Sequence, residues 1–190
     1  MNKKENMARH IEIPLKADVI SSLQAGDMVL LSGEVYTARD VAHRRLYEAL
    51  NKGDKLPFDL KKAVIFYAAP APTPPGKIIG SVGPTTSCRM DAFTPKLIEH
   101  GLKGMVGKGN RSPEVIAAIK KYGAVYFGAI GGIAALSSQC VKKAELVAYE
   151  DLGPEAIRKL TVVDFPVIVI NDPAGNDLYA QAENRWRINN

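Results

Sequence analysis

The sequence predicts a mixed fold of helices and strands, either α/β or α+β, in a single domain. Short apolar runs that are typical of buried strands recur along the chain, and amphipathic helical segments alternate with them in its middle. The chain has 190 residues, of which 46% are hydrophobic and 24% are charged. This length and composition suit one domain that buries a sizeable core without disulfide or metal staples.

Seven segments predict strands because they are apolar, short and bounded by glycine, proline or polar residues. They cover residues 28–31, 64–67, 78–82, 104–106, 125–127, 146–149 and 167–170. A proline-rich stretch at 68–75, AAPAPTPP, lies between the second and the third of them. It is too short for a domain linker, so it predicts a loop.

Helices are predicted where apolar side chains recur every three or four residues, or where capping residues bracket a segment. The clearest helix covers about 37–52, with Thr37 as its expected N-cap. Ser112 and Pro113 open another helix, which Gly123 ends. Further helices are expected at 94–101, 134–136 and 155–160, and polar tails at about 1–10 and 184–190.

The composition excludes several classes of protein. The two cysteines, Cys88 and Cys140, form no CxxC pair, which argues against a secreted disulfide scaffold and against a metal cluster held by this chain alone. The N-terminus has no apolar signal-peptide region, and the longest apolar run, 125–136, is too short to cross a membrane. The formal net charge of +5 fits an anionic ligand, nucleic acid or a solvated surface.

Three cations fall at predicted strand-to-helix junctions. Arg39 lies in the first turn of a predicted helix, Arg89 follows the turn GPTTS, and Lys108 lies in GKGN before the next helix. A cation at a helix N-terminus opposes the helix dipole by about 0.3–1 kcal/mol. Three such placements favour a site where side chains and free N–H groups collect an anion. Two arginine forks and one lysine suit a dianion such as a dicarboxylate.

Each of these residues also has a structural interpretation. Arg39 is compatible with a solvated helix face, and the glycines of GKGN are typical turn residues. GKGN is not a P-loop, because it lacks the required spacing and the following Ser or Thr. His43 is compatible with ordinary packing on an amphipathic helix, and the hydroxyl residues of GPTTS with a turn. Cys88 is compatible with a small packed residue or a reactive thiol.

Five segments together resemble one family and keep its order of motifs. They are SGEVYTARDVAHRR (32–45), LPFDLKKAVIFYAAP (56–70), SVGPTTSCRMD (81–91), GKGN (107–110) and NDPAGNDLY (171–179). The family is the beta subunit, or C-terminal domain, of the class I iron–sulfur hydro-lyases, which include fumarate hydratase and L-tartrate dehydratase. The resemblance covers roughly residues 14–179, and the patterns TARDxAHRR and GPTTSxRM are its most specific part.

The resemblance implies a fold, a cofactor and a partner. The fold is the α/β swivelling β/β/α domain found at the C-terminus of class I fumarases. The family's alpha part binds a [4Fe-4S] cluster through three cysteines and leaves one iron open for substrate. This chain resembles only the beta part, so the resemblance implies no metal ligand here. The cluster is expected on a separate alpha subunit, in a hetero-oligomer.

The resemblance also implies roles for individual residues. Arg39 and Arg89 fall on the family's substrate-carboxylate arginines, and Lys108 falls on the lysine of its KGN segment. Thr85 falls on the threonine proposed as catalytic base, with Thr86 as the alternative if the register differs by one. These assignments agree with the anion site that the three cations predict.

Asp40 and His43 match the motif as supporting residues, which orient Arg39 and cap its helix. The activity implied is reversible hydration of fumarate to L-malate, and L-tartrate dehydration is the alternative. A nonenzymatic anion-binding or assembly subunit is a second alternative. Nucleic-acid binding is not expected, because the chain lacks an RNP motif, a helix-turn-helix pattern and an aromatic platform. The absent signal sequence and the cluster chemistry favour a cytoplasmic location.

Overall fold

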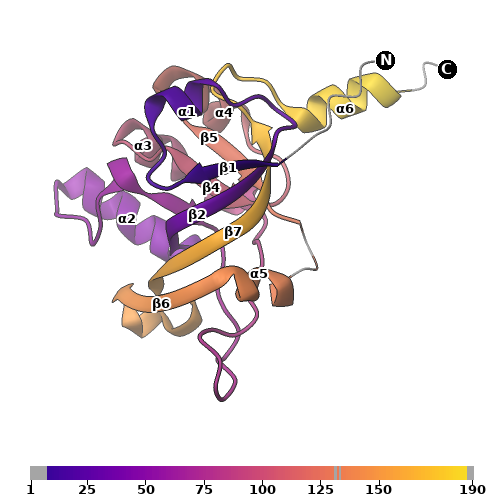
Figure 1. Cartoon of the computed structure of the whole chain (residues 1–190). Coiled ribbons are helices and arrows are strands. Elements are labelled where there is room, and N and C mark those ends of the chain that lie inside the picture. Colours follow the sequence, from indigo (N-terminus) through magenta and orange to yellow (C-terminus); the bar gives the residue numbers. More distant parts are fainter. Residues whose placement is uncertain (1–7, 131, 133, 188–190) are drawn as a thin grey trace.

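A small closed barrel forms the centre of the molecule. The computed structural model describes residues 8–130, 132 and 134–187. Four strands pair in parallel, namely β2 (Met28–Thr37), β3 (Val64–Phe66), β4 (Gly104–Gly107) and β5 (Val125–Gly128). The long β7 (Ile157–Asn171) runs antiparallel and is hydrogen-bonded to both β5 and β2 (Figure 1). Because β7 joins the first and last of the parallel strands, the sheet closes on itself.

Two further strands extend the sheet outside the barrel. β6 (Val141–Ala148) pairs antiparallel with β7, and β1 (Arg9–Glu12) pairs in parallel with β2. The predicted polar tail at about 1–10 is therefore wrong at its end, because Arg9 and His10, although exposed, already belong to β1 and pair with the edge of β2. Residues 1–7 of that predicted tail lie outside the described residues.

Three helices pack against the outside of the barrel: α2 (Asp40–Lys52), α3 (Thr94–Glu99) and α4 (Pro113–Tyr122). As predicted, Ser112 caps α4 by accepting a hydrogen bond from the Val115 N–H at 3.4 Å. The other helical segments are α1 (Ala17–Ser21), α5 (Ala134–Cys140), α6 (Leu178–Trp186), η1 (Leu60–Lys62), η2 (Ser87–Met90) and η3 (Glu150–Glu155). No helix among the described residues has the length and apolar character needed to span a membrane.

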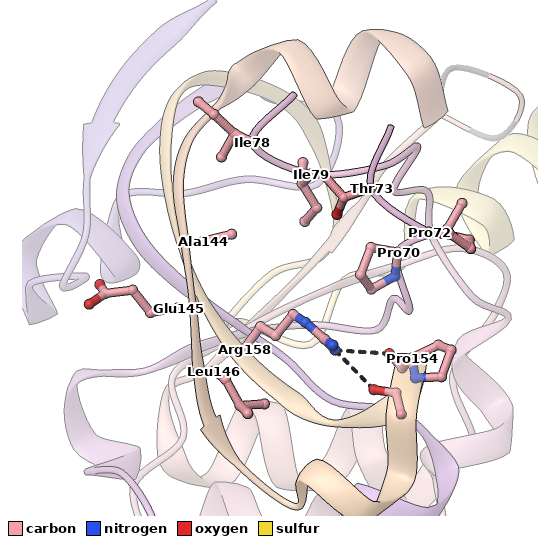
Figure 2. A pocket seen from close by; sticks show the side chains of 12 residues that line it. Pro70, Pro72, Thr73, Ile78, Ile79, Ala144, Glu145, Leu146, Pro154 and Arg158 are labelled. Carbon is pink, nitrogen blue, oxygen red and sulfur yellow. Dashed lines mark hydrogen bonds between the residues drawn. The ribbon is translucent and has the colours of Figure 1, made fainter. Parts of the chain in front are cut away.

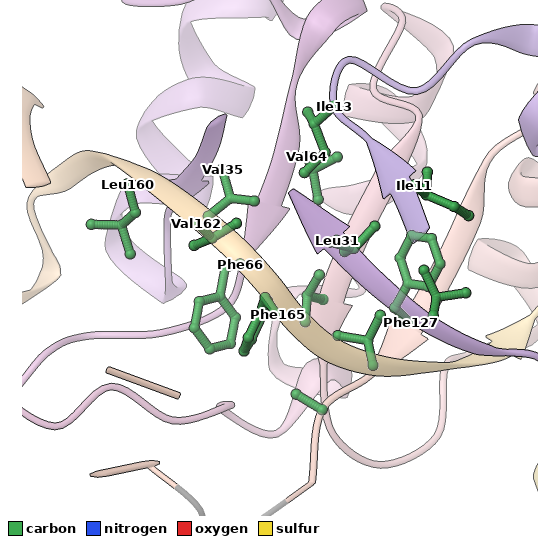
Figure 3. Close-up of a cluster of buried hydrophobic side chains, with 14 of the residues drawn as sticks. Ile11, Ile13, Leu31, Val35, Val64, Phe66, Phe127, Leu160, Val162 and Phe165 are labelled. Carbon is green, nitrogen blue, oxygen red and sulfur yellow. The ribbon is translucent and has the colours of Figure 1, made fainter. Parts of the chain in front are cut away.

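The apolar side chains of the strands alternate between two cores. Phe66 and Phe127 point into the barrel, where they pack with residues of β2 and β7 (Figure 3). Ile65 and Tyr126, on the same two strands, face outward and are buried beneath the helices. Both faces of the parallel strands are therefore buried, which explains why these strands are unbroken apolar runs in the sequence.

Two predicted elements are absent. The segment 78–82 is an irregular loop and not a strand, in which Ile79 and Val82 are buried against the barrel core while Ile78 is 53% exposed. The predicted helix at 155–160 is instead the end of η3 and the start of β7. Its backbone pairs with β2 and β6, and this ladder overrides a weak local helical pattern.

The C-terminal part also differs from expectation. α6 extends to Trp186, so the predicted tail at 184–190 is wrong at its start, while 188–190 lie outside the described residues. Asp177 caps this helix by accepting a hydrogen bond from the Tyr179 N–H at 2.8 Å. In Figure 1, α6 projects away from the barrel. The mixed architecture of strands and covering helices confirms the predicted α/β class.

Candidate active site

The rim of the barrel at the carboxyl ends of the parallel strands gathers the residues that the sequence singled out. Since β2, β3 and β4 run in parallel, the residues that follow them emerge at the same edge. Arg39 follows β2, Tyr67 follows β3 and Lys108 follows β4. In α/β folds the loops at this edge commonly form the functional site.

The segment that carries Thr85 and Thr86 returns to this rim and lies between the ends of β3 and β4. The Thr85 N–H donates to the carbonyl of Tyr67 at 2.6 Å, and the Lys108 N–H donates to the carbonyl of Thr85 at 3.2 Å. Thr86 and Lys108 form an isolated parallel bridge, and the Ser87 N–H donates to the carbonyl of Lys108 at 2.8 Å. Backbone hydrogen bonds therefore fix the proposed base and the proposed lysine side by side.

Arg39, Asp40 and Arg89 form a charge cluster on the same rim. Arg89 donates from Nε to Oδ1 of Asp40 at 2.8 Å and from Nη2 to Oδ2 at 2.7 Å. The Nε of Arg39 lies 3.7 Å from the same carboxylate. Two of the three predicted cations are thus brought together by one carboxylate. The third, Lys108, is hydrogen-bonded to the start of η2, the turn that carries Arg89.

Thr37 does not cap α2 as predicted. It is the last residue of β2, and its buried hydroxyl donates to the carbonyl of Ala156 at 3.3 Å and accepts from the N–H of Arg158 at 3.0 Å. Arg39 occupies the N-cap position, where no side chain in the described part of the chain caps the helix. Asp40, which the resemblance implies as a cap of this helix, makes no capping hydrogen bond among the described residues, because the β2 ladder continues past the apolar run and delays the helix.

His43 is buried at the start of α2. Its Nδ1–H donates to the carbonyl of Arg39 at 3.0 Å, and its ring meets Tyr67 edge to face with centroids 5.0 Å apart. Burial lowers the pKa of His43 to about 4, so the imidazole is neutral at physiological pH. The contact with the Arg39 backbone is compatible with the supporting role that the resemblance implies.

Arg111 is a buried cation that the sequence reasoning missed. Its Nε donates to Oδ1 of Asp91 at 2.8 Å, and its Nη1 donates to the hydroxyl of Tyr67 at 3.1 Å. The guanidinium lies over the rings of Tyr67 and Tyr126, 5.2 and 4.9 Å from their centroids. Its position directly after the GKGN motif is the sequence feature from which Arg111 could have been predicted. The geometry makes Arg111 a support beneath the rim, since its side chain is sealed from solvent.

Tyr126 connects the two loops of the rim. Its hydroxyl donates to the carbonyl of Gly109 at 2.9 Å and is 2.8 Å from Oγ of Ser87, which can donate to it. Burial raises the pKa of the Tyr126 phenol, so it stays protonated. Gly107 permits this close approach, because a Cβ there would lie 2.0 Å from Oγ of Ser87. Gly109 has φ of +79°, which agrees with its interpretation as a turn residue.

The donor groups of this chain do not fit an iron–sulfur cluster. Cys88 is exposed on η2, whereas Cys140 at the end of α5 is half-buried, and burial raises the pKa of its thiol. In the ranges that the structure describes, no group of three or more His, Cys, Asp or Glu side chains could hold a metal ion.

A cleft of about 430 Å³ lies between the proline-rich loop and β6 (Figure 2). Its walls include Pro70, Ile79 and Leu146, and the guanidinium of Arg158 points toward Pro154 within it. None of the site residues predicted from the sequence lines this cleft. The predicted cations lie instead on the open rim, where Arg89 and Lys108 are exposed.

Known proteins resemble the chain along most of its length. The chain is 44% identical over 172 residues to the anaerobic class I fumarate hydratase of Escherichia coli, covering 90% of this chain and 31% of that relative. It is 42% identical over 164 residues to fumarate hydratase 2 of Leishmania major, covering 85% of this chain and 29% of that relative. The chain thus spans about three-tenths of the length of these fumarate hydratases.

A shorter relative matches this chain nearly from end to end. The L(+)-tartrate dehydratase subunit beta of Escherichia coli is 37% identical over 180 residues, covering 92% of this chain and 88% of that relative. The family model described as "Fumarase C-terminus" matches residues 1–182. The small closed mixed barrel agrees with the swivelling β/β/α fold of that domain. The chain therefore belongs to the fumarase C-terminus family, which the class I fumarate hydratases share with the beta subunits of L-tartrate dehydratase.

Proposed function

We propose that the chain is the beta subunit of a two-subunit iron–sulfur fumarate hydratase, which hydrates fumarate reversibly to L-malate. In this proposal a separate alpha subunit holds the [4Fe-4S] cluster, and the two subunits form a cytoplasmic hetero-oligomer. The higher identity to fumarate hydratases supports the substrate. The near end-to-end match with a dehydratase beta subunit supports the two-subunit arrangement.

The charge cluster at the barrel rim carries the proposal. Asp40 engages only the Nε and Nη2 atoms of Arg89, so the Nη1 atom makes no hydrogen bond within the described residues. The Nη1 of Arg39 likewise makes no hydrogen bond there. Each guanidinium can therefore keep its carboxylate neighbour and still donate to a substrate carboxylate. Two arginines arranged in this way suit a dicarboxylate.

The same residues suit the chemistry of hydration. In the reverse reaction a proton leaves the carbon next to a carboxylate, and negative charge builds up on that carboxylate. Arg39, Arg89 and Lys108 would stabilise this charge where it develops. Thr85 would take the proton at Oγ1 as the alkoxide, after its own hydroxyl proton had passed to solvent, and the positive charge of the nearby cations would favour this deprotonated form. No hydrogen bond among the described residues occupies the hydroxyls of Thr85 or Thr86, which leaves both available to a substrate.

L-tartrate dehydration is the alternative activity. It is supported by the relative whose length matches this chain, although that relative is less identical than the fumarate hydratases. Both substrates are dicarboxylates, so the arginine cluster does not distinguish them. A nonenzymatic subunit that binds anions or only assembles with the alpha subunit is the remaining alternative.

The test uses the intact complex, captured anaerobically from native lysate with this chain as bait. Fumarate hydration and tartrate dehydration are measured in parallel, first for the wild type and then for Arg89→Ala. We expect fumarate turnover in the wild type and a loss of kcat/KM of at least about 100-fold in the variant, with the complex still assembled.

Arg45→Ala is the matched control. Arg45 also pairs with a carboxylate through two short contacts, 2.8 and 2.6 Å to Asp151, but this pair makes no hydrogen bond or ion pair with Arg39, Asp40 or Arg89. It should keep the wild-type kcat/KM. Unchanged turnover in Arg89→Ala would contradict the carboxylate role of Arg89. Turnover of tartrate without turnover of fumarate would make L-tartrate the substrate in place of fumarate. No turnover of either substrate, with an intact iron–sulfur partner present, would favour the nonenzymatic reading.

A further inference from the structure

Glu155 reaches the charge cluster from a distant part of the sequence. Its Oε1 lies 3.5 Å from Nη2 of Arg39, and the two side chains are 26% and 23% exposed. The cluster is thereby an alternating row of four charges: Glu155, Arg39, Asp40 and Arg89. Arg39 lies between two carboxylates, of which one belongs to its own helix and the other comes from η3.

The backbone around Glu155 is held in place from two sides. Nη1 of Arg158 donates to the carbonyls of Pro154 and Ala156, each at 3.4 Å, and Figure 2 shows this guanidinium against Pro154. The hydroxyl of Thr37 donates to the same carbonyl of Ala156 at 3.3 Å. Since Thr37 lies two residues before Arg39, the backbones that carry the two partners are tied to each other.

The contacts of Arg39 differ in kind from those of Arg89. Arg89 makes two hydrogen bonds of 2.7 and 2.8 Å, whereas Arg39 makes ion pairs of 3.5 and 3.7 Å, which are too long for hydrogen bonds of good geometry. Nε of Arg39 and Oε2 of Glu155 are shielded from solvent and have no hydrogen-bond partner among the described residues. The direction of the Arg39 guanidinium therefore depends on the charges of its two carboxylate neighbours.

We propose that Glu155 is a positioning residue, which sets the direction in which Arg39 presents its donors to a substrate carboxylate. The inference rests on the proposed function, in which Arg39 binds that carboxylate. Glu155 has two opposing effects on the affinity for a dicarboxylate. Its negative charge alone repels a dianion, so removing it should tighten binding. Its hold on Arg39 orders the guanidinium, so removing it should weaken binding.

The test is Glu155→Gln in the assembled complex, because this substitution keeps the size of the side chain and removes its charge. Kinetics are measured with fumarate, and the binding of succinate, an unreactive dicarboxylate, is measured by calorimetry. We expect KM and the succinate Kd each to rise about tenfold, with a smaller change in kcat. Glu155→Asp, which retains the charge, should recover part of this loss.

A double-mutant cycle with Arg39→Ala separates positioning from general destabilisation. If Glu155 acts through Arg39, then Glu155→Gln should add little to the loss in the Arg39→Ala background. Asp151→Asn is the control on the same segment, because it breaks the exposed pair with Arg45 at 2.6 Å and should leave KM unchanged.

Three results would overturn the inference: tighter succinate binding in Glu155→Gln, a KM and Kd within twofold of the wild type, or a loss that adds fully to that of Arg39→Ala. Failure of the proposed function looks different, because the wild-type complex would then turn over neither fumarate nor tartrate. In that case, comparing the succinate Kd of the wild type with that of Glu155→Gln still decides whether Glu155 positions Arg39. If the wild type does not bind succinate either, both proposals fail.

Discussion

Single charged residues on the barrel rim determine which ligands the site can attract. The rim carries three cations, Arg39, Arg89 and Lys108, and two carboxylates, Asp40 and Glu155. Its formal net charge is therefore +1. The carboxylates reduce the attraction for a dianion, but they fix two guanidinium groups that would otherwise sample many rotamers. The solvated-face interpretation of Arg39 does not hold, because its side chain is only 23% exposed.

His43 makes the stability of the chain sensitive to acid. Its folded-state pKa of about 4 lies below the ordinary value of 6.5, so between these pH values the unfolded state binds a proton that the folded state does not. The free energy of unfolding should therefore fall as the pH drops from 6.5 toward 4, by about 2–3 kcal/mol from this group.

Urea unfolding at pH 7 and at pH 4.5 measures this effect. The variant His43→Leu should lose clearly less stability than the wild type over the same interval, whatever its stability at pH 7. His100→Leu, which alters an exposed histidine, should keep the acid sensitivity of the wild type. Equal pH dependence in His43→Leu and the wild type would show that His43 is not the titrating group.

The ends of regular elements, more than the elements themselves, build the candidate site. The loop after β3 returns to the rim, where Thr86 pairs with Lys108, the residue that follows β4. The hydroxyl of Tyr126 on β5 makes hydrogen bonds to both segments, at Ser87 and at Gly109. The barrel thus provides neighbouring parallel strand ends, and one phenol holds the Thr85 segment against the Lys108 segment. The close approach of these segments depends on Gly107.

Tyr126→Phe tests this link between elements. The variant keeps the ring but leaves the hydroxyl of Ser87 and the carbonyl of Gly109 without their partner, so we expect a loss of about 1–3 kcal/mol in the free energy of unfolding. In the assembled complex kcat should fall, because the two segments that carry Thr85 and Lys108 lose the contact through Tyr126 that supplements their backbone hydrogen bonds.

Tyr122→Phe is the control for this prediction. Its hydroxyl makes one exposed hydrogen bond of 3.3 Å, to Glu99, and lies away from the rim. It should change stability by less than about 0.5 kcal/mol and leave kcat unchanged. A Tyr126→Phe complex with wild-type kcat and wild-type stability would refute the role of this phenol.

At the scale of the whole molecule, the candidate site is an open surface. The exposed residues Thr86, Arg89 and Lys108 lie on the rim, and none of them lines the cleft of Figure 2. Enzyme sites work best where water is excluded and charges act at low dielectric. An open rim of this kind therefore fits a half-site that a second subunit covers, as the proposed function requires.

Hydrogen exchange of the chain with and without its partner tests this arrangement. On assembly with the alpha subunit, amides in 39–40, 85–90 and 107–110 should exchange at least about tenfold more slowly, because the partner would exclude water from the rim. Helix α6, which projects from the barrel in Figure 1, is the internal reference and should not change. Protection of α6 with an unprotected rim would place the interface elsewhere.

The sequence alone determined the class of fold, most of the parallel strands and the motifs that mark the family. These features depend on local information: apolar runs, the Ser112–Pro113 helix start and the residue types of short motifs. It also placed Arg39 and Lys108 at strand ends, and parallel pairing then brought those ends to one edge. Arg89 reaches this edge from η2, because the strand predicted before it at 78–82 is a loop.

Only the tertiary structure decided which residues the cations meet. Thr37 was predicted as a helix cap, but it ends β2 and pairs with Phe66 of β3. Its hydroxyl bonds the carbonyl of Ala156, the residue after Glu155 and 119 positions away along the chain. The predicted helix at 155–160 became strand for the same reason, because the long-range pairing of β7 outweighs local propensity. Local sequence encodes element type and motif, whereas the pairing of Glu155 with Arg39 arises only when barrel closure brings the end of β2 against the start of β7.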